Sequence, residues 1–152
     1  MDIVIPSLPY LDYLIINEIE ASRIVDIDIY NDKDEIDIEK VKLVAKKLKE
    51  LGVKELVVIH ASSFGLIYDG KEYYILSALK LSNSFIKSSV GAGDGFCAGI
   101  LYGILNDYNN IDKLRLASCV AAGVLNSETS QSEIKGLENF LQLENKYGRI
   151  KL

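Results

Sequence analysis

The sequence contains little cysteine, histidine, proline or tryptophan. Its 152 residues include two cysteines, one histidine, two prolines and no tryptophan. Cys97 and Cys119 are too few for a disulfide framework and lie among apolar residues, which indicates buried thiols in a reducing compartment. With a single histidine, His60, the chain also lacks the residues for a Cys/His zinc cluster. These absences exclude a disulfide-rich or zinc-stabilised fold.

Long apolar runs and an excess of basic residues are missing as well. No stretch reaches the ~18 consecutive apolar residues of a membrane span. The residues Met1-Asp2-Ile3 do not resemble the start of a secretory signal, because they carry no basic region. Lys and Arg number 17 against 22 Asp and Glu, a net charge of −5, whereas nucleic acids and anionic membranes attract basic surfaces. We therefore expect a cytoplasmic protein that binds neither nucleic acid nor membrane.

The composition is that of a soluble globular protein. Hydrophobic residues make up 49% of the chain and charged residues 26%. No internal repeat, low-complexity tract or linker divides the sequence, and its length is that of one ordinary domain with a sizeable core. We predict a single domain over residues 1–152.

Three segments have the pattern of strands. Tyr13–Ile16 and Glu55–His60 are short apolar runs of strand length, and the second suits a strand that is covered on both faces. Phe64–Leu76, with Asp69-Gly70 at its centre, is typical of a hairpin. The sequence thus predicts a sheet built from its first half.

Helical spacing predicts helices between and after these strands. The expected helices cover Glu18–Ile24, Ile38–Leu51, Phe96–Leu105, Ile111–Leu125 and Ser132–Lys146. Residues 6–10 contain both prolines, and we expect them to be irregular because a residue before proline avoids the helical region. Alternation of strands and helices indicates an α/β layered fold whose sheet is at least partly parallel.

A glycine-rich turn, Gly91-Ala92-Gly93-Asp94, stands directly before an apolar helix. Two glycines permit a tight or left-handed backbone, and the N–H groups of the first helical turn point outward at the positive end of the helix dipole. Such a turn can bind a phosphate. Asp94 would repel that anion, so it is either a helix cap or a base held beside the phosphate. The residues alone leave both interpretations open.

Two common phosphate-binding motifs do not fit this turn. The Rossmann fingerprint needs glycine or alanine at its last place, where this chain has Phe96, so a dehydrogenase is disfavoured. The P-loop needs Lys-Ser or Lys-Thr after the glycines, and neither pair is present.

Three segments, taken in order, resemble the ribokinase/PfkB family of sugar kinases. Asn17-Glu18-Ile19-Glu20 resembles the N-x-x-E motif after a strand, Val57–Gly65 resembles the strand and loop at the nucleotide, and Ser88–Gly99 resembles the C-terminal signature with its GAGD turn. An alanine-rich helix with Ala121-Ala122-Gly123 follows. The resemblance covers nearly the whole chain but only the C-terminal half of the family. It implies a ribokinase-like three-layer α/β/α fold, of which this chain would be the C-terminal half.

The resemblance also implies an ATP-dependent carbohydrate kinase. Asp94 would be the general base that takes the proton from the attacking sugar hydroxyl, and the N–H groups around Gly91, Ala92 and Gly93 would form the anion hole. The family's use of ATP and Mg²⁺ carries over, with room for a monovalent cation. The acceptor would be a small sugar or sugar-like alcohol.

Two further groups of residues would bind the cofactors. Asn17 and Glu20 would place Mg²⁺ and the phosphates through water. Ser62 and Gly65 would line the nucleotide site. The helix that carries Ala122 and Gly123 would flank the adenine.

The chain departs from the family at several places. Ser88-Ser89 stand where Asp-Thr is frequent, and His60 and Ser62 replace the threonine and first glycine of the loop. His60 is therefore interpreted as a core or loop histidine. The half that supplies most of the sugar pocket and the lid has no counterpart here, which leaves open a non-catalytic module that binds nucleotide or packs against a partner. The resulting open sheet edge predicts a homo-oligomer or association with a separate N-terminal half.

Overall fold

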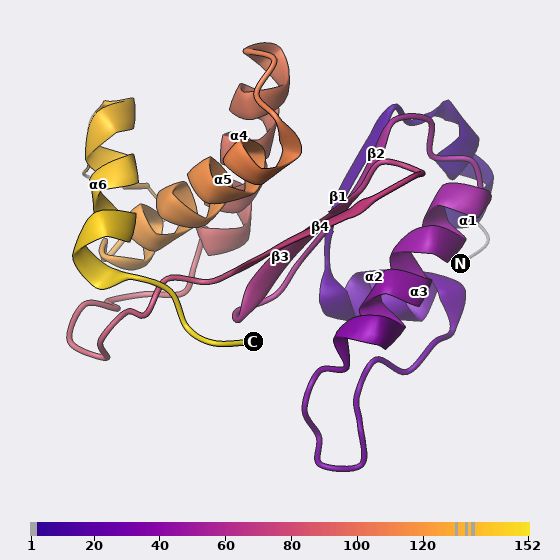
Figure 1. Ribbon diagram of the computed structural model, residues 1–152, viewed down its shortest axis with the longest axis horizontal. Helices are drawn as coiled ribbons and strands as arrows, with labels where there is room; N and C mark the ends of the chain where they lie inside the picture. The colour runs from indigo at the N-terminus through magenta and orange to yellow at the C-terminus, as the bar shows by residue number, and fades with distance from the viewer. Residues whose placement is uncertain (1–2, 130, 133, 135) are drawn as a thin grey trace. The chain divides into compact units, whose positions relative to one another are not determined.

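The computed structural model describes residues 3–129, 131–132, 134 and 136–152, and within them four short strands form one sheet in the order β1-β2-β3-β4 (Figure 1). The strands are β1 (Tyr13–Asn17), β2 (Leu56–His60), β3 (Phe64–Tyr68) and β4 (Tyr73–Ser77). The chain divides into two compact units. The first comprises Met1–Ala61 and Leu66–Tyr74, and the second comprises Ser62–Gly65 and Ile75–Leu152. This is an α/β fold, as the sequence predicts.

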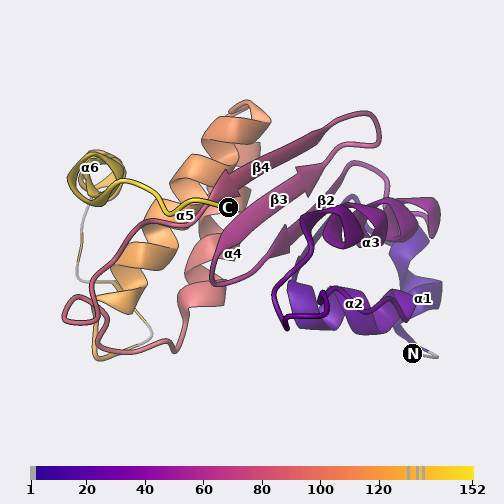
Figure 2. The same ribbon diagram turned by 60° about the horizontal axis from the view of Figure 1, so that its bottom comes forward.

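In the first unit, β1 and β2 pair in parallel, with a register that runs from Tyr13 opposite Leu56 to Asn17 opposite His60. Helix α2 (Glu18–Val25) follows β1 directly, and α3 (Ile38–Glu50) packs beside α2 and against β2 (Figure 2). Both helices and both strands agree with the sequence predictions to within about two residues. The buried core of these elements consists of Ala21, Ile24, Val41, Val44, Ala45, Leu48, Leu56, Val57, Val58 and Ile59.

The amphipathic helix α3 shows why this unit could be predicted. Its side chains at helical spacing are buried, and its N-terminus is capped by Asp37, whose carboxylate accepts from the N–H groups of Glu39 and Lys40. Gly52 follows the helix with φ +116°, and a Cβ there would lie 2.8 Å from Cγ of Pro9. Glycine is therefore required at this position by both conformation and space.

The prediction of an irregular segment at residues 6–10 is wrong. The structure has a short helix α1 (Val4–Ser7), followed by the 3₁₀ turn η1 (Leu8–Tyr10). Proline lacks an N–H group, but the first turn of a helix does not use that group, so both prolines are tolerated. The side chain of Leu8 is completely buried and anchors the segment.

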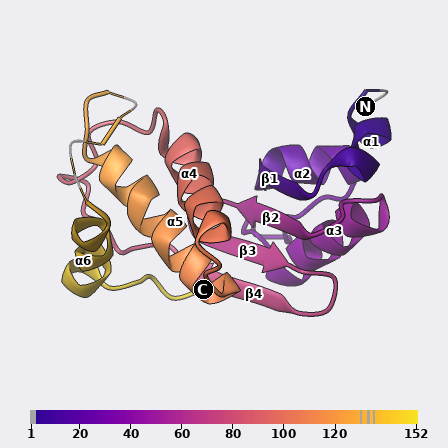
Figure 3. The same ribbon diagram turned by 90° about the horizontal axis from the view of Figure 1, so that it is seen from above.

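The second unit contains three helices among its described residues: α4 (Ala92–Leu105), α5 (Asn110–Leu125) and α6 (Leu137–Tyr147). Helices α4 and α5 lie side by side (Figure 3) and approach closely at Gly99, where a Cβ would lie only 2.5 Å from Cα of Ala117. Helix α4 begins four residues earlier than expected, because Ala92, Gly93, Asp94 and Gly95 are already helical.

Two other boundaries differ from the predictions. Strand β4 begins at Tyr73, because the Asp69 carboxylate accepts from the N–H groups of Lys71 and Glu72 and so makes a four-residue turn. Helix α6 begins at Leu137 instead of Ser132, and residues 133 and 135 of the expected first turns lie outside the described residues.

The C-terminal segment is tied to the second unit by Arg149. Its Nε lies 2.7 Å from Oε1 of Glu144, its Nη2 lies 3.1 Å from Oγ of Ser118, and its Nη1 donates to the carbonyl of Ser77. Nearby Cys119 is buried, and burial raises the pKa of its thiol to about 11. Both cysteines are free thiols, but only Cys119 is buried; Cys97 is partly exposed, so the prediction of two buried thiols is wrong for Cys97. None of the helices in the described part of the chain has the length and apolar character needed to cross a membrane.

Candidate active site

In the first unit, polar residues gather where the two parallel strands end. Asn17 ends β1 and His60 ends β2, and the register places them opposite each other. Ligands of α/β proteins bind outside the carboxyl ends of parallel strands. The edge that carries Asn17 and His60 is therefore the edge at which a binding site is expected.

Asn17 has a structural role in addition to any contact with a ligand. It is the N-cap of α2, and its Oδ1 accepts from the N–H group of Glu20 at 2.8 Å. An asparagine cap satisfies one of the free N–H groups at a helix start. The carboxylate of Glu20 is exposed in the first helical turn and remains available to solvent or a ligand.

The charge of Glu20 influences two neighbouring groups. Burial raises the pKa of Glu18, and the Glu20 carboxylate raises it further, against the effect of a backbone hydrogen bond. Burial lowers the pKa of His60, while the Glu20 carboxylate opposes that change. Two carboxylates at the edge of the sheet give this site a negative potential, which suits a cation bridging to phosphates.

The same residues do not form a complete metal site. Within the ranges that the structure describes, no group of three or more His, Cys, Asp and Glu side chains could hold a metal ion. Mg²⁺ usually keeps several waters and binds through one or two carboxylates together with substrate phosphates. The donor set of Asn17 and Glu20 therefore fits a hydrated Mg²⁺ that is also held by phosphates.

In the second unit, the glycine-rich turn has the conformation of an anion-binding helix start. Gly91 has φ +82°, in the left-handed region, and no side chain caps the helix there. The first helical hydrogen bond joins the Gly95 N–H group to the Gly91 carbonyl at 2.8 Å. The N–H group of Ala92 donates to the carbonyl of Ser89 at 3.4 Å, whereas the N–H groups of Gly93 and Asp94 precede the first helical bond and so have no partner within the helix.

The position of Asp94 excludes one of the two interpretations left open by the sequence. The residue at the cap is Gly91, and Asp94 lies inside the first turn with an exposed side chain. It therefore does not cap the helix. Its charge also contributes, after burial, to a raised pKa of the half-buried Cys97 thiol one turn further along.

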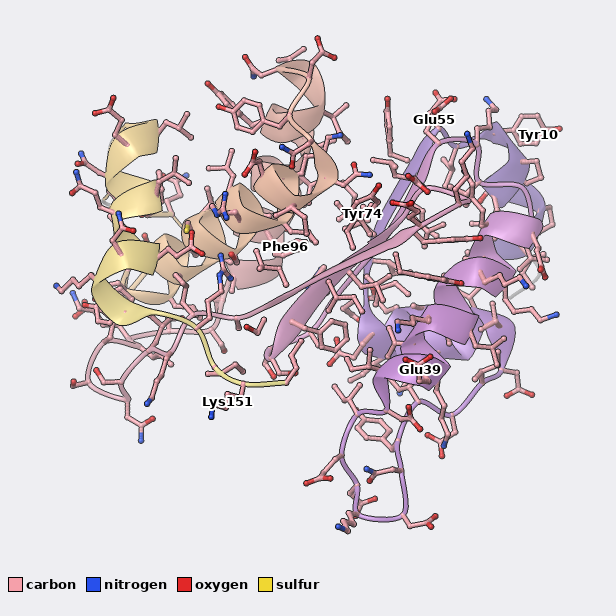
Figure 4. All side chains as sticks on the ribbon, in the orientation of Figure 1. Tyr10, Glu39, Glu55, Tyr74, Phe96 and Lys151 are labelled. Atoms are coloured by element: carbon pink, nitrogen blue, oxygen red, sulfur yellow. The ribbon has the colours of Figure 1, made fainter. Side chains whose placement is uncertain are left out.

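Gly65 and Phe96 form a contact that the sequence does not reveal. Gly65 is buried in β3, and a Cβ there would lie 2.8 Å from Cζ of Phe96 and 3.0 Å from Cδ2 of Leu114. Phe96 is labelled in Figure 4. In the sequence, Phe96 serves only to exclude the Rossmann motif. In the structure it fixes the start of β3 against the first turns of α4. Ser62, which precedes β3, is exposed.

Ala122 and Gly123 lie in the interior of the second unit. Ala122 packs with Leu79, Cys119 and Leu143. A Cβ at Gly123 would lie 2.5 Å from Cε1 of Phe140, so glycine lets the aromatic ring of α6 approach α5. Their contact with an adenine stays a prediction.

The predicted site residues thus fall into two groups. Asn17 and Glu20 belong to the first unit, where His60 joins them. Ser62, Gly65 and the glycine-rich turn with Asp94 belong to the second unit, as do the two small residues of α5.

A family model and curated relatives both match this chain, and they point to the same family. The model of the pfkB family carbohydrate kinases matches residues 5–135. A 5-dehydro-2-deoxygluconokinase from Clostridium beijerinckii is 32% identical over 106 residues, which are 66% of this chain and 30% of that protein. The chain therefore spans about a third of the length of that relative.

Solved structures share the fold. A mutant of phosphofructokinase-2 from Escherichia coli has a TM-score of 0.75 at 14% identity, over 98% of this chain and 45% of that one. Ribokinase from Thermotoga maritima has a TM-score of 0.70 at 22% identity, over 91% of this chain and 43% of that one. At these identities the likeness concerns the fold, which is ribokinase-like. The family model covers most of the sequence, and the chain belongs to the pfkB family of carbohydrate kinases.

Proposed function

We propose that residues 1–152 are the nucleotide-binding and phosphoryl-transfer half of an ATP-dependent carbohydrate kinase. The observation that carries the proposal is the start of α4, where left-handed Gly91 opens an uncapped helix and Asp94 stands exposed in the first turn. Free N–H groups next to an exposed carboxylate suit a reaction in which a phosphate and a hydroxyl meet.

In this mechanism Asp94 is the general base. Its carboxylate takes the proton of the acceptor hydroxyl while the hydroxyl oxygen forms a bond to the γ-phosphorus of ATP and the bond to the β-phosphate oxygen breaks, which releases ADP. The N–H groups around Gly91, Ala92 and Gly93 stabilise the negative charge on the transferred phosphoryl group. A positioned base of this kind contributes ~10²–10⁴ in rate.

Asn17 and Glu20 are proposed to place the phosphates together with Mg²⁺. When bound, Mg²⁺ would neutralise charge on the phosphate oxygens. Support comes from the exposed Glu20 carboxylate and the negative potential around it, which suit contacts through water. A monovalent cation is a further candidate that the family resemblance allows.

Ser62 and Gly65 are proposed to form one wall of the nucleotide site. Ser62 is exposed and offers a hydroxyl group, whereas Gly65 is buried and holds the loop close to Phe96. Ala122 and Gly123 are proposed to support the adenine side by setting the distance between α5 and α6. Their burial makes this an effect of packing.

The acceptor is proposed to be a small sugar or sugar-like alcohol, phosphorylated in the cytoplasm. Support comes from the names of the relatives, which are kinases of carbohydrates. The pocket that would select the sugar belongs to the part of those proteins that this chain does not span.

Calorimetric titration of Mg²⁺-ATP into the 152-residue chain tests the nucleotide site. We expect saturable binding by the native chain and by Asp94→Asn, because the base does not hold the nucleotide. We expect no binding by Gly91→Val, because a β-branched residue cannot adopt φ +82°. GTP serves as the control nucleotide. Absence of ATP binding by the folded native chain would refute the proposed site.

The catalytic role of Asp94 needs a second measurement. Sugar-stimulated ATP consumption should fall by ~10²-fold or more in Asp94→Asn, with the affinity for ATP unchanged. ATP binding without any stimulation by a panel of sugars would instead indicate a non-catalytic nucleotide-binding module.

A further inference from the structure

Two serines, Ser88 and Ser89, stand directly before the glycine-rich turn and take part in its structure in different ways. The side chain of Ser88 is half-buried, and its Oγ accepts from the N–H group of Val90 at 3.2 Å. Ser89 is exposed, and its carbonyl accepts from the N–H group of Ala92 at 3.4 Å. A serine hydroxyl that binds the backbone two residues further on makes a local turn. The shape of this segment therefore depends on the side chain of Ser88 and on the backbone of Ser89.

One peptide plane connects the Ser88 hydroxyl with the first residue of α4. The N–H group of Val90 and the carbonyl of Ser89 belong to the same peptide bond, and a peptide bond is planar. Ser88 holds the N–H end of this plane, while the N–H group of Ala92 binds its carbonyl end. The Ser88 hydroxyl therefore sets the direction of the carbonyl to which Ala92 is bound.

The four residues from Ser89 to Ala92 form a β-turn of the kind that needs a glycine. The closing hydrogen bond joins the Ala92 N–H group to the Ser89 carbonyl, and Gly91 has φ +82° and ψ −2°. These are the angles of the third residue of a type II turn, where glycine is favoured because φ is positive. The closing bond is long at 3.4 Å, so a second support on the same peptide plane stabilises the turn.

The segment before the turn is fixed to the end of α5. The N–H groups of Lys87 and Ser88 both donate to the carbonyl of Leu125, at 2.8 Å and 3.4 Å. Leu125 is the last residue of α5, and the carbonyls of a last helical turn have no partner within the helix. The backbone of Ser88 is thereby anchored, so its hydroxyl acts on the following peptide plane from a fixed position.

We propose that Ser88 is a positioning residue for the anion hole at the start of α4. Its hydroxyl fixes the peptide plane before Val90 and, through that plane, the position of Ala92. The N–H groups of Gly93 and Asp94 follow directly and are thereby aimed at the transferred phosphoryl group before ATP binds. This inference rests on the proposed function of the turn. Donors that already point to the site of developing charge stabilise it best, because they need no reorganisation during the reaction.

Calorimetric titration of Mg²⁺-ATP into the native chain and into Ser88→Ala tests this role. One intramolecular hydrogen bond corresponds to about a fivefold change in an equilibrium constant, so we expect the dissociation constant for Mg²⁺-ATP to rise by about fivefold. Mg²⁺-ADP is the matched ligand, because it lacks the phosphoryl group at which the N–H groups are aimed. Its dissociation constant should be the same for both proteins.

Two variants separate the hydroxyl group from other effects. Ser88→Thr keeps a hydroxyl group at the same position and should restore native ATP binding. Ser89→Ala makes the same chemical change one residue further on, where the side chain is exposed and the carbonyl is retained. It should bind ATP as the native chain does. Urea unfolding midpoints show whether each variant is folded.

The outcomes distinguish this inference from the proposed function. If the native chain binds ATP and Ser88→Ala binds it equally well, the positioning role is overturned and the proposed site stands. Equal losses of ATP and ADP binding, or an equal loss in Ser89→Ala, would overturn it too, because the hydroxyl would then support the fold in general. A native chain that does not bind ATP would refute the proposed site and the positioning role together.

Amide hydrogen exchange followed by NMR tests the geometry without any ligand. In Ser88→Ala the N–H group of Val90 should exchange about fivefold faster than in the native chain, and that of Ala92 should exchange faster as well. Ser88→Thr should restore the native rates. Unchanged exchange at Val90 in Ser88→Ala would show that the hydroxyl does not hold the peptide plane, and the proposal would fail.

Discussion

The two units start their principal helices in different ways. In the first unit, α2 and α3 are capped by the side chains of Asn17 and Asp37. In the second unit, α4 begins at left-handed Gly91 without a side-chain cap. Helix α5 of the same unit is capped by Asn109, and α6 begins at a glycine like α4. A glycine at the cap costs only a few tenths of a kcal/mol relative to a capping side chain, and at α4 it leaves N–H groups available to a ligand.

The units also differ in how their helices pack. Helix α3 is amphipathic and buries a stripe of branched side chains, with lysines on the outside. Helices α4 and α5 approach through Gly99 and Ala117, with backbone close to backbone. The first kind of packing tolerates small adjustments of side chains, whereas the second tolerates none, because backbone atoms cannot move aside. Substitutions at the helix contacts and at the helix caps test these two differences between the units.

The largest effect is expected at Gly99. In Gly99→Ala the new Cβ would lie 2.5 Å from Cα and 2.9 Å from N of Ala117, so the two helices must separate. We expect the free energy of unfolding to fall by about 2–3 kcal/mol, even though alanine favours a helix over glycine by about 1 kcal/mol. Urea unfolding followed by circular dichroism measures the change.

Gly103→Ala provides the control on the same helix. Its nearest neighbours would be Cγ of Lys113 at 2.8 Å and Cα of Lys113 at 3.3 Å, and no backbone atom lies as close as at Gly99, so we expect a smaller loss of stability than for Gly99→Ala. Equal stability of Gly99→Ala and Gly103→Ala would mean that the helices do not pack through their backbones.

A smaller effect is expected at the caps of the first unit. Asn17→Ala and Asp37→Ala should each lower the free energy of unfolding by about 1 kcal/mol. Asn17→Ser should restore stability, because serine also caps helices. Thermal unfolding and Mg²⁺-ATP titration of the same four proteins, native chain included, would separate the two roles of Asn17.

The outcome for Asn17→Ser decides whether Asn17 does more than cap. Weak ATP binding with native stability would confirm a contact with the ligand. If Asn17→Ser binds ATP as tightly as the native chain does, the role of Asn17 is only to cap the helix. Asp37→Ala is the control: it removes a cap far in sequence from the proposed site residues and should bind ATP normally.

The smallest effect is a pH dependence at Glu18. Burial and the charge of Glu20 raise its pKa above the ordinary value of 4.5, so the folded state favours the protonated carboxyl. The stabilisation by this preference is complete below pH 4.5 and is lost as the pH rises through the folded pKa. Glu18→Gln should therefore be more stable than the native chain at pH 7, and the difference should vanish below pH 4.5.

Urea unfolding midpoints of Glu18→Gln and the native chain, measured from below pH 4.5 to pH 7, test this prediction. A difference that is constant with pH would place the effect in packing instead of ionisation. Glu20→Gln should reduce the dependence, because it removes one of the charges that raise the pKa of Glu18.

Elements with strong periodicity were predictable from local sequence. The heptad-like apolar pattern of α3 and the run Leu56–His60 depend on neighbours within a few residues, and both agree with the structure. The segment around Pro6 and Pro9 was not predictable in this way. Its helical form depends on the burial of Leu8, which is a contact with distant residues.

For the candidate site, too, some features follow from local sequence and others depend on the tertiary structure. The residue order Gly91-Ala92-Gly93-Asp94 determined that a glycine-rich turn precedes a helix, and the ordered motifs determined the family. The sequence left the role of Asp94 open, and the observation that Gly91 occupies the cap removed one of the two interpretations.

The sequence by itself indicated the α/β class and a sheet that is at least partly parallel, because periodicity is a local property of the chain, and its resemblance to the family named the candidate site residues. Only the tertiary structure decided that Asn17 faces His60 across the strands, that Gly65 lies against Phe96, and that α4 buries one apolar face while exposing the other. These facts depend on contacts between residues far apart in the sequence, and packing of the whole chain is what selects them.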